Sequence, residues 1–303
     1  MNPRVQLPLV LTIGVLAVSC AAVIIRFASN AHPEHTPLFS LVIAAGRLTI
    51  ASLVLLPFTL QGLKKHTISG RAWGFMLASG VMLALHFMTW ITSLSYTSIA
   101  SSTALATTTP VWVALISWFF LKSPPTLQTI VGITVALGGG ALVAFGQEAT
   151  STAPNPLLGN LLALIGAMCA GAYFMLGRQA QQLGVPTQLY AGLAYGAAAL
   201  TLLPMPLVFG VGYQAPLEAY FWIAMLALIP QLIGHTSFNW AMKHMNPTLV
   251  TLLILLEPVG SSLLAMLFFR EYPGLQVILG GVVLLLGVAV ASFPTRSRAG
   301  AAY

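Results

Sequence analysis

Apolar stretches long enough to cross a bilayer follow one another along the whole chain. A helix needs roughly 20 mostly apolar residues to span the hydrocarbon core. Cutting at the polar, charged and proline-rich junctions gives ten candidate spans. They cover residues 7–28, 38–60, 70–93, 98–121, 126–146, 157–179, 186–209, 217–242, 247–269 and 273–293. Only 6% of the residues are charged, against about 25% in a soluble domain. We therefore predict an all-α multipass protein whose main partner is the lipid bilayer.

The charged residues predict how the chain is oriented. With the N-terminus in the cytoplasm, nine Lys and Arg residues fall on the cytoplasmic side, whereas Arg26 and Arg270 fall on the other. This asymmetry follows the positive-inside rule, so both termini are expected in the cytoplasm and the protein in the plasma (inner) membrane. The same asymmetry accounts for the formal net charge of +7. No basic cluster with interleaved aromatic residues is present, so nucleic acid is not an expected partner.

The chain also resembles itself. At an offset of 148 residues, seven positions of spans four and five coincide with spans nine and ten without a gap. The pairs are Pro110–Pro258, Phe120–Phe268, Lys122–Arg270, Pro125–Pro273, Gln128–Gln276, Gly132–Gly280 and Gly139–Gly287. Each half, residues 1–150 and 151–303, holds five spans, and an odd number predicts a second repeat that is inverted in the membrane. Such repeats are typical of secondary transporters with a binding site near the midplane.

A known family shares these features. The five-plus-five organisation, Ala45-Gly46-Arg47, Thr109-Pro110 and Glu257-Pro258 resemble EamA-type members of the drug/metabolite transporter superfamily. The resemblance implies a basket of ten helices around a central cavity, with spans five and ten at its periphery. It also implies export of small metabolites across the plasma membrane. Members resembling the YddG exporters move amino acids, often aromatic ones, and some toxic organic cations.

Two charged residues, Arg47 and Glu257, fall well inside spans. A charge at the centre of a span costs on the order of 2.5–3.5 kcal/mol on insertion scales. Glu257 could bind a proton, a substrate ammonium or Arg47. Alternatively, it could satisfy backbone groups freed by Pro258, as Thr109 could beside Pro110. Both interpretations of Glu257 stay open. Arg47 could meet a substrate carboxylate, but we favour a structural pairing.

Span three carries a stripe of polarizable and polar side chains. Met82, His86, Trp90 and Ser93 follow at helical spacing and share one face. Such a face suits an organic substrate with a planar ring. A histidine at this depth must face protein or water, so we expect His86 to face a cavity.

Span eight carries a second stripe. Gln231, His235 and Asn239 follow at successive i+4 steps, and Pro230 predicts a kink. These side chains either line a cavity or bind neighbouring helices, and we favour the cavity. Spans three and eight correspond in the two halves, so both stripes are expected to meet on one axis.

Weaker candidates complete the predicted cavity. Trp112 follows Thr108 by one helical turn, and Tyr173 lies in span six. Pro110 and Pro258 are expected to act as kinks or hinges in matching helices.

The predicted function is that of a secondary exporter working by alternating access. Its substrates would be small organic metabolites, foremost aromatic or apolar amino acids, and toxic organic cations. A carrier of phosphorylated or nucleotide-sugar metabolites is the alternative, although Arg47 would be the sole cation available. An intramembrane enzyme or a channel is disfavoured, since paired carboxylates, close histidine motifs and filter-like sequences are missing. No cofactor, metal or catalytic residue is predicted, and a monomer is expected.

Overall fold

The apolar stretches form helices because a helix satisfies its own backbone groups where water is absent. The computed structural model describes residues 3–32, 36–121, 126–145, 153–244, 250, 253–254 and 256–292. Within these ranges the secondary structure is helical, without strands. Seven helical segments there are long and apolar enough to cross a membrane, and three shorter apolar helices accompany them. The predicted all-α multipass class is confirmed.

The described residues of the first half form seven helices, two pairs of which share a predicted span. These are α1 (Pro3–Ser19), α2 (Ala21–Asn30), α3 (Phe39–Lys65), α4 (Gly70–Ser93), α5 (Ile99–Ala106), α6 (Thr109–Leu121) and α7 (Leu127–Phe145). Cys20 separates α1 from α2, and Thr107 and Thr108 separate α5 from α6. The predicted fourth span is therefore a helix interrupted in its middle.

The described helices of the second half include a π-helix. They are α8 (Pro156–Gln182), α9 (Thr187–Leu202), α10 (Met205–Val208), α11 (Leu217–Leu226), η1 (Ala227–His235), α12 (Thr236–His244), α14 (Glu257–Phe269) and α15 (Leu275–Ser292). The π-helix η1 contains Pro230. A proline inside a helix removes one backbone donor and clashes with the preceding turn, and i→i+5 bonding is one way to accommodate it. Pro230 thus lies where the backbone bonding changes to i→i+5, and a bend of the helix axis there stays a prediction.

Helices from the two halves pack against one another throughout the bundle. Helix α4 of the first half packs along α8 of the second half. Helix α11 of the second half packs against α2 of the first, and η1 and α12 pack against α1. The helices α3 and α9 contact each other directly. Most buried apolar residues form one core that draws on both halves.

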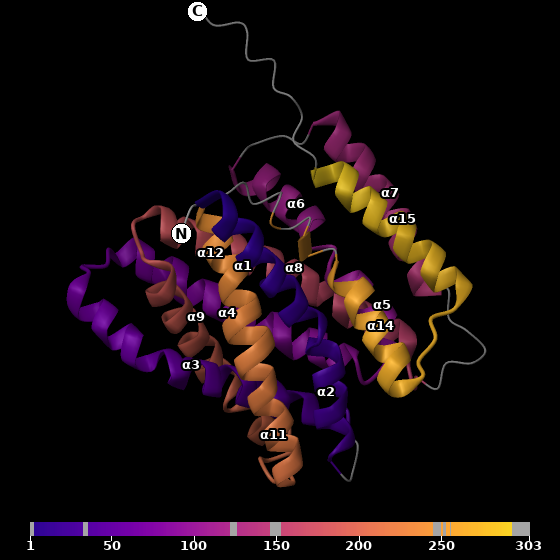
Figure 1. Cartoon of the computed structure of the whole chain (residues 1–303), viewed down its shortest axis with the longest axis horizontal. Coiled ribbons are helices and arrows are strands. Elements are labelled where there is room, and N and C mark those ends of the chain that lie inside the picture. The colour runs from indigo at the N-terminus through magenta and orange to yellow at the C-terminus, as the bar shows by residue number, and fades with distance from the viewer. Residues whose placement is uncertain are drawn as a thin grey trace, which may run out of the picture.

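The helices α7 and α15 lie side by side at one edge of the bundle (Figure 1). A Cβ on Gly132 would lie 2.6 Å from the carbonyl oxygen of Gly287, and one on Gly139 would lie 2.8 Å from that of Gly280. The contacts run in opposite directions along the two helices, so the pair is antiparallel. Under the 148-residue offset, Gly132 corresponds to Gly280 and Gly139 corresponds to Gly287. Gly132 therefore contacts the equivalent of Gly139, and Gly139 contacts the equivalent of Gly132. Two copies related by a two-fold axis make contacts of this kind.

Large apolar side chains cover much of the outside of the bundle. Leu200, Leu267 and Phe119 are more than 70% exposed. An exposed apolar surface of this kind marks a membrane-facing protein. Arg47, His86, Gln231 and Asn239 are buried instead.

Candidate functional site

A small cavity lies where the two halves of the chain meet. It has a volume of about 40 Å³. The first half contributes Val18, His86, Trp90, Ala106, Thr107 and Thr109. The second half contributes Ala170, Tyr173, Phe174, His235, Phe238, Ile254 and Glu257. At about 10–15 Å³ for each water molecule, the cavity holds a few waters but no amino acid. The structure therefore has a narrow central cavity.

Aromatic and imidazole rings form one wall of this cavity. The rings of His86 and Trp90 on α4 are stacked, with centroids 5.8 Å apart and an interplanar angle of 5°. The ring of His235 on η1 lies 6.4 Å from that of His86. His86 Nδ1 lies 2.9 Å from the carbonyl oxygen of Gly166. A carbonyl only accepts, so Nδ1 is the donor and Nε2 of a neutral His86 is left as an acceptor.

Hydrogen bonds hold Tyr173 at the back of the cavity. Asn239 Nδ2 donates to Tyr173 Oη over 2.6 Å and lies 3.4 Å from Tyr195 Oη. Ser79 Oγ and Tyr190 Oη are 2.7 Å apart. These side chains are buried and join α4, α8, α9 and α12. A satisfied network of this kind fixes the positions of the helices around the cavity.

The Thr-Pro and Glu-Pro sequences occupy the same structural place. Pro110 is the second residue of α6, and Pro258 is the second residue of α14. A proline in the first turn interrupts no intrahelical hydrogen bond, and its fixed φ suits the start of a helix. The predicted hinge prolines therefore begin helices in the middle of the bundle, and neither kinks a continuous helix.

The residues before these two prolines differ in what they can bond. Thr109 Oγ1 donates to the carbonyl oxygen of Ala106 over 3.2 Å, at the end of α5. An ionised carboxylate only accepts, whereas a protonated one can donate as Thr109 does. Glu257 lies at the start of α14, where a helix dipole favours an acid, and it also lines the cavity. Both interpretations of Glu257 are therefore compatible with the structure.

Arg47 on α3 is completely buried beside the cavity wall. Its Nε donates to Gln231 Oε1 over 2.8 Å, and its Cζ lies 3.9 Å from the centre of the Phe87 ring. In the described part of the chain, Arg47 Nη1 and Nη2 and Gln231 Nε2 have no acceptor. The ion pair found among the described residues joins Arg26 and Glu271, so Arg47 and Glu257 are not within 4 Å of each other. The direct pair considered from the sequence is absent in this conformation.

Four residues expected to line the cavity lie elsewhere. Met82 packs against the main core. Trp112 lines a separate apolar pocket of about 140 Å³, and its Nε1 donates to Thr108 Oγ1. Gln231 and Asn239 bind other helices, which was the less favoured interpretation. The π-helix separates Gln231 from His235, because residues four apart do not share one face when the backbone bonds run i→i+5. Asn239 lies on α12 and bonds to Tyr173, which itself lines the cavity.

The sequence analysis also missed residues that matter at the site. Val18 and Phe238 carry no sequence signal that separates them from packing residues. Thr107 and Thr109 border the break between α5 and α6. Three consecutive threonines before a proline could have indicated that break, since their hydroxyls donate to the freed carbonyls of α5.

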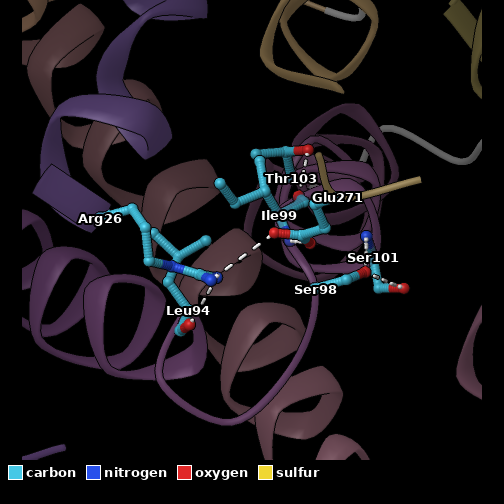
Figure 2. A network of polar contacts seen from close by, with 7 residues as sticks. All are labelled: Arg26, Leu94, Ser98, Ile99, Ser101, Thr103 and Glu271. Atoms are coloured by element: carbon cyan, nitrogen blue, oxygen red, sulfur yellow. Dashed lines mark hydrogen bonds and ion pairs between the residues drawn. The ribbon is translucent and has the colours of Figure 1, made fainter. Parts of the chain in front are cut away.

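A polar network ties the two halves together at the end of the bundle where α5 begins (Figure 2). Glu271, which follows α14, accepts from the backbone N–H of Ile99 and lies 3.6 Å from Arg26 Nη1. Arg26 Nη2 donates to the carbonyl oxygen of Leu94 over 3.1 Å. The carboxylate thus satisfies an orphan donor at the start of α5 and pairs with a cation on α2. The sequence placed both charges on one side of the membrane but did not predict their contact.

The same family matches both halves of the chain. The sequence model of the EamA-like transporter family matches residues 8–145 and, a second time, residues 157–293. The chain belongs to the EamA-like transporter family. As a member it is a multipass membrane protein of transporter type, and the family resemblance found in the sequence is confirmed. Nothing in these matches assigns it to a YddG-like subgroup.

Similar proteins are described as transporters or exporters. An "uncharacterized transporter" of Archaeoglobus fulgidus is 25% identical over 81% of this chain and 84% of its own length. A "probable terminal-alkyne amino-acid exporter" of Streptantibioticus cattleyicolor is 28% identical over 62% of each chain. The "pseudopaline exporter CntI" of Pseudomonas aeruginosa is 23% identical over 70% of this chain and 72% of its own.

A solved crystal structure has a similar fold. It matches 95% of this chain and 97% of its own with a TM-score of 0.64 and 20% sequence identity. At this identity the likeness concerns the fold alone.

Proposed function

We propose that this EamA-like transporter is a secondary exporter of small organic metabolites, foremost amino acids with aromatic or apolar side chains. The observation that carries the proposal is the central cavity, which is lined by stacked rings from the first half and by one acid from the second half. Planar rings suit an aromatic substrate, and the acid suits its ammonium group. The printed names of two relatives, an amino-acid exporter and a pseudopaline exporter, point toward the same class.

The proposed architecture is ten spans arranged as two inverted five-helix repeats, residues 1–150 and 151–303. The reciprocal glycine contacts of α7 and α15 support it, because they obey the 148-residue offset with a two-fold relation. The matching starts of α6 and α14 support it as well. An internal two-fold completes the cavity within one chain, which fits a monomer. From the positive-inside rule, both termini are placed in the cytoplasm of a cell with the protein in its inner membrane.

Alternating access requires that each end of the cavity open in turn. The network of Arg26, Glu271 and Ile99 is proposed to hold the non-cytoplasmic end closed, since it joins the two halves where no other described ion pair does. Separating the two halves at this end would break the Arg26–Glu271 ion pair and the hydrogen bond from the Ile99 N–H to Glu271. The small cavity fits a state between outward and inward opening.

Export of organic cations is a second candidate function. Glu257 and the rings of His86, Trp90 and Tyr173 would recognise a cation through charge and through the ring faces. A phosphorylated substrate is less suitable, because the described lining contains an acid and no lysine or arginine. An acid without a neighbouring lysine or arginine disfavours a dianionic phosphate.

The proposal is tested by purified protein in proteoliposomes, with a panel of amino acids, organic cations and phosphorylated compounds. We expect saturable exchange that favours aromatic amino acids, measured with and without an imposed pH gradient. Glu257→Gln should lower transport or alter its pH response. Preference for phosphorylated compounds would refute the proposed substrate class, and unsaturable flux would indicate a channel. Unchanged transport and pH response in Glu257→Gln would make Glu257 structural.

A further inference from the structure

We infer that the cavity, in a state wider than the one described, binds its substrate as a zwitterion, with the ammonium on Glu257 and the carboxylate on the indole N–H of Trp90, in the field of Arg47. The inference rests on the proposed function and specifies how the substrate is recognised. It assigns a separate task to each of three residues that the fold alone does not explain.

Trp90 supplies an unused donor to the cavity. It is 3% exposed, lines the cavity, and its Nε1 has no partner among the described residues. An indole N–H can only donate, and a buried donor without an acceptor is unfavourable. His235 also lines the cavity with an unpartnered Nδ1. The indole N–H of Trp90 therefore has no acceptor among the described residues, and a substrate carboxylate would supply two acceptor oxygens.

Arg47 adds positive potential behind that wall. Its guanidinium lies 3.9 Å from the centre of the Phe87 ring, and this ring contacts His235 edge-on, at 5.2 Å between centroids. The charge interacts electrostatically with His86, His235 and Glu257. Its Nη1 and Nη2 are unpaired in the described part of the chain. A buried cation without a contacting anion is unfavourable, so an anionic group in the cavity would be favoured there.

Glu257 provides the complementary charge. It lines the same cavity and forms no ion pair with a described residue. The aromatic rings of Trp90 and Tyr173 border the same space. Ring faces attract cations, so they would add to the attraction between Glu257 and a substrate ammonium. The cavity thus offers one anion for a cation and unpaired donors for an anion.

Both substrate charges are needed to satisfy these groups. An amine without a carboxylate would leave the Trp90 donor unpaired, and an acid without an ammonium would face Glu257. A site built around a polar group rejects analogues that lack it, because its own buried groups then lose their partners. We expect each analogue that lacks one charge to bind at least about tenfold more weakly.

The test uses the full chain in proteoliposomes, preloaded with labelled L-phenylalanine. Unlabelled L-phenylalanine, phenethylamine and 3-phenylpropionate are then compared as competitors. Wild type should prefer phenylalanine to both analogues at least about tenfold. Trp90→Phe keeps a ring and removes the donor, so its preference for phenylalanine over phenethylamine should shrink. Glu257→Gln should instead shrink the preference for phenylalanine over 3-phenylpropionate.

The matched control is Trp112→Phe. The indole N–H of Trp112 is already bonded to Thr108 and lines a different pocket, so this variant should keep wild-type selectivity. Size-exclusion elution and circular dichroism establish that each variant is folded. Equal competition by all three compounds in the wild type would overturn the inference and leave the exporter proposal standing. Failure of every aromatic compound to exchange would overturn the proposed function, and the inference with it. Selectivity that changes equally in Trp112→Phe and Trp90→Phe would also overturn the inference.

Discussion

Gly138 and Gly139 are neighbours in α7 that differ in what a side chain would meet. A Cβ on Gly139 would lie 2.2 Å from the backbone nitrogen of Leu284 on α15, whereas a Cβ on Gly138 would have no heavy atom within 4 Å. Ordinary contact begins at 3.4 Å, so the shortfall at Gly139 is 3.4 − 2.2 = 1.2 Å. The obstacle is backbone and cannot rotate away. Gly139→Ala therefore forces α7 and α15 apart, and Gly138→Ala does not.

The expected magnitudes separate the two variants clearly. Inserting a methyl group into a closely packed contact costs about 1–3 kcal/mol. Alanine at an unobstructed helical position gains about 0.5–1 kcal/mol over glycine. The free energies of unfolding of Gly138→Ala and Gly139→Ala should therefore differ by about 1.5–4 kcal/mol, with Gly139→Ala the less stable.

The assay is unfolding of purified protein in mild detergent by increasing dodecyl sulfate, followed by circular dichroism. The facing helix offers a repeat of the experiment, because a Cβ on Gly280 would lie 2.7 Å from Val143 N and one on Gly281 would be unobstructed. Gly280→Ala should thus be less stable than Gly281→Ala. Equal stability of Gly138→Ala and Gly139→Ala would refute the argument that close backbone approach holds this pair together.

Two further predictions concern buried or bridging polar groups. Glu271→Ala should lower unfolding stability more than Glu271→Gln, because glutamine still accepts from the Ile99 N–H, and an unpaired donor costs about 1–3 kcal/mol. Thermal unfolding in detergent measures the difference, with exposed Glu218→Ala as control; equal losses for the two Glu271 variants would contradict the capping role. Tyr190→Phe should cost about 1 kcal/mol in the dodecyl sulfate assay, because the bond to Ser79 is lost. No loss of stability would mean that this hydroxyl pair does not hold α9 to α4.

The sequence predicted the class of fold through two independent patterns. Apolar run length predicted membrane-crossing helices, and the offset of 148 residues paired Gly132 with Gly280 and Gly139 with Gly287 before any contact was known. The offset alone does not say which of these glycines touch. The reciprocal contact depends on how closely the backbones of α7 and α15 approach each other, and the pattern of residues in one sequence does not give this distance.

The sequence predicted those site residues whose side chains are titratable and therefore energetically unfavourable inside a bilayer. His86, His235 and Glu257 are such residues, and the structure brings them around one cavity. Gln231 and Asn239 were assigned by helical periodicity, which assumes 3.6 residues for each turn. The π-helix around Pro230 breaks that assumption between Gln231 and His235. Whether the cavity residues contact substrate stays a prediction.

The reciprocal contact of α7 and α15 has an evolutionary consequence. Each glycine of this contact meets the equivalent of the other. A single five-helix chain inserted in both orientations would make the same contact with its own copy, so one gene would be enough to form it. Identical copies would have to place the same residue before both helix-starting prolines. Fusion into one polypeptide removes that constraint. The acid at Glu257 and the hydroxyl of Thr109 are a difference that two identical copies could not keep, and it gives the two halves of the cavity lining different chemistry.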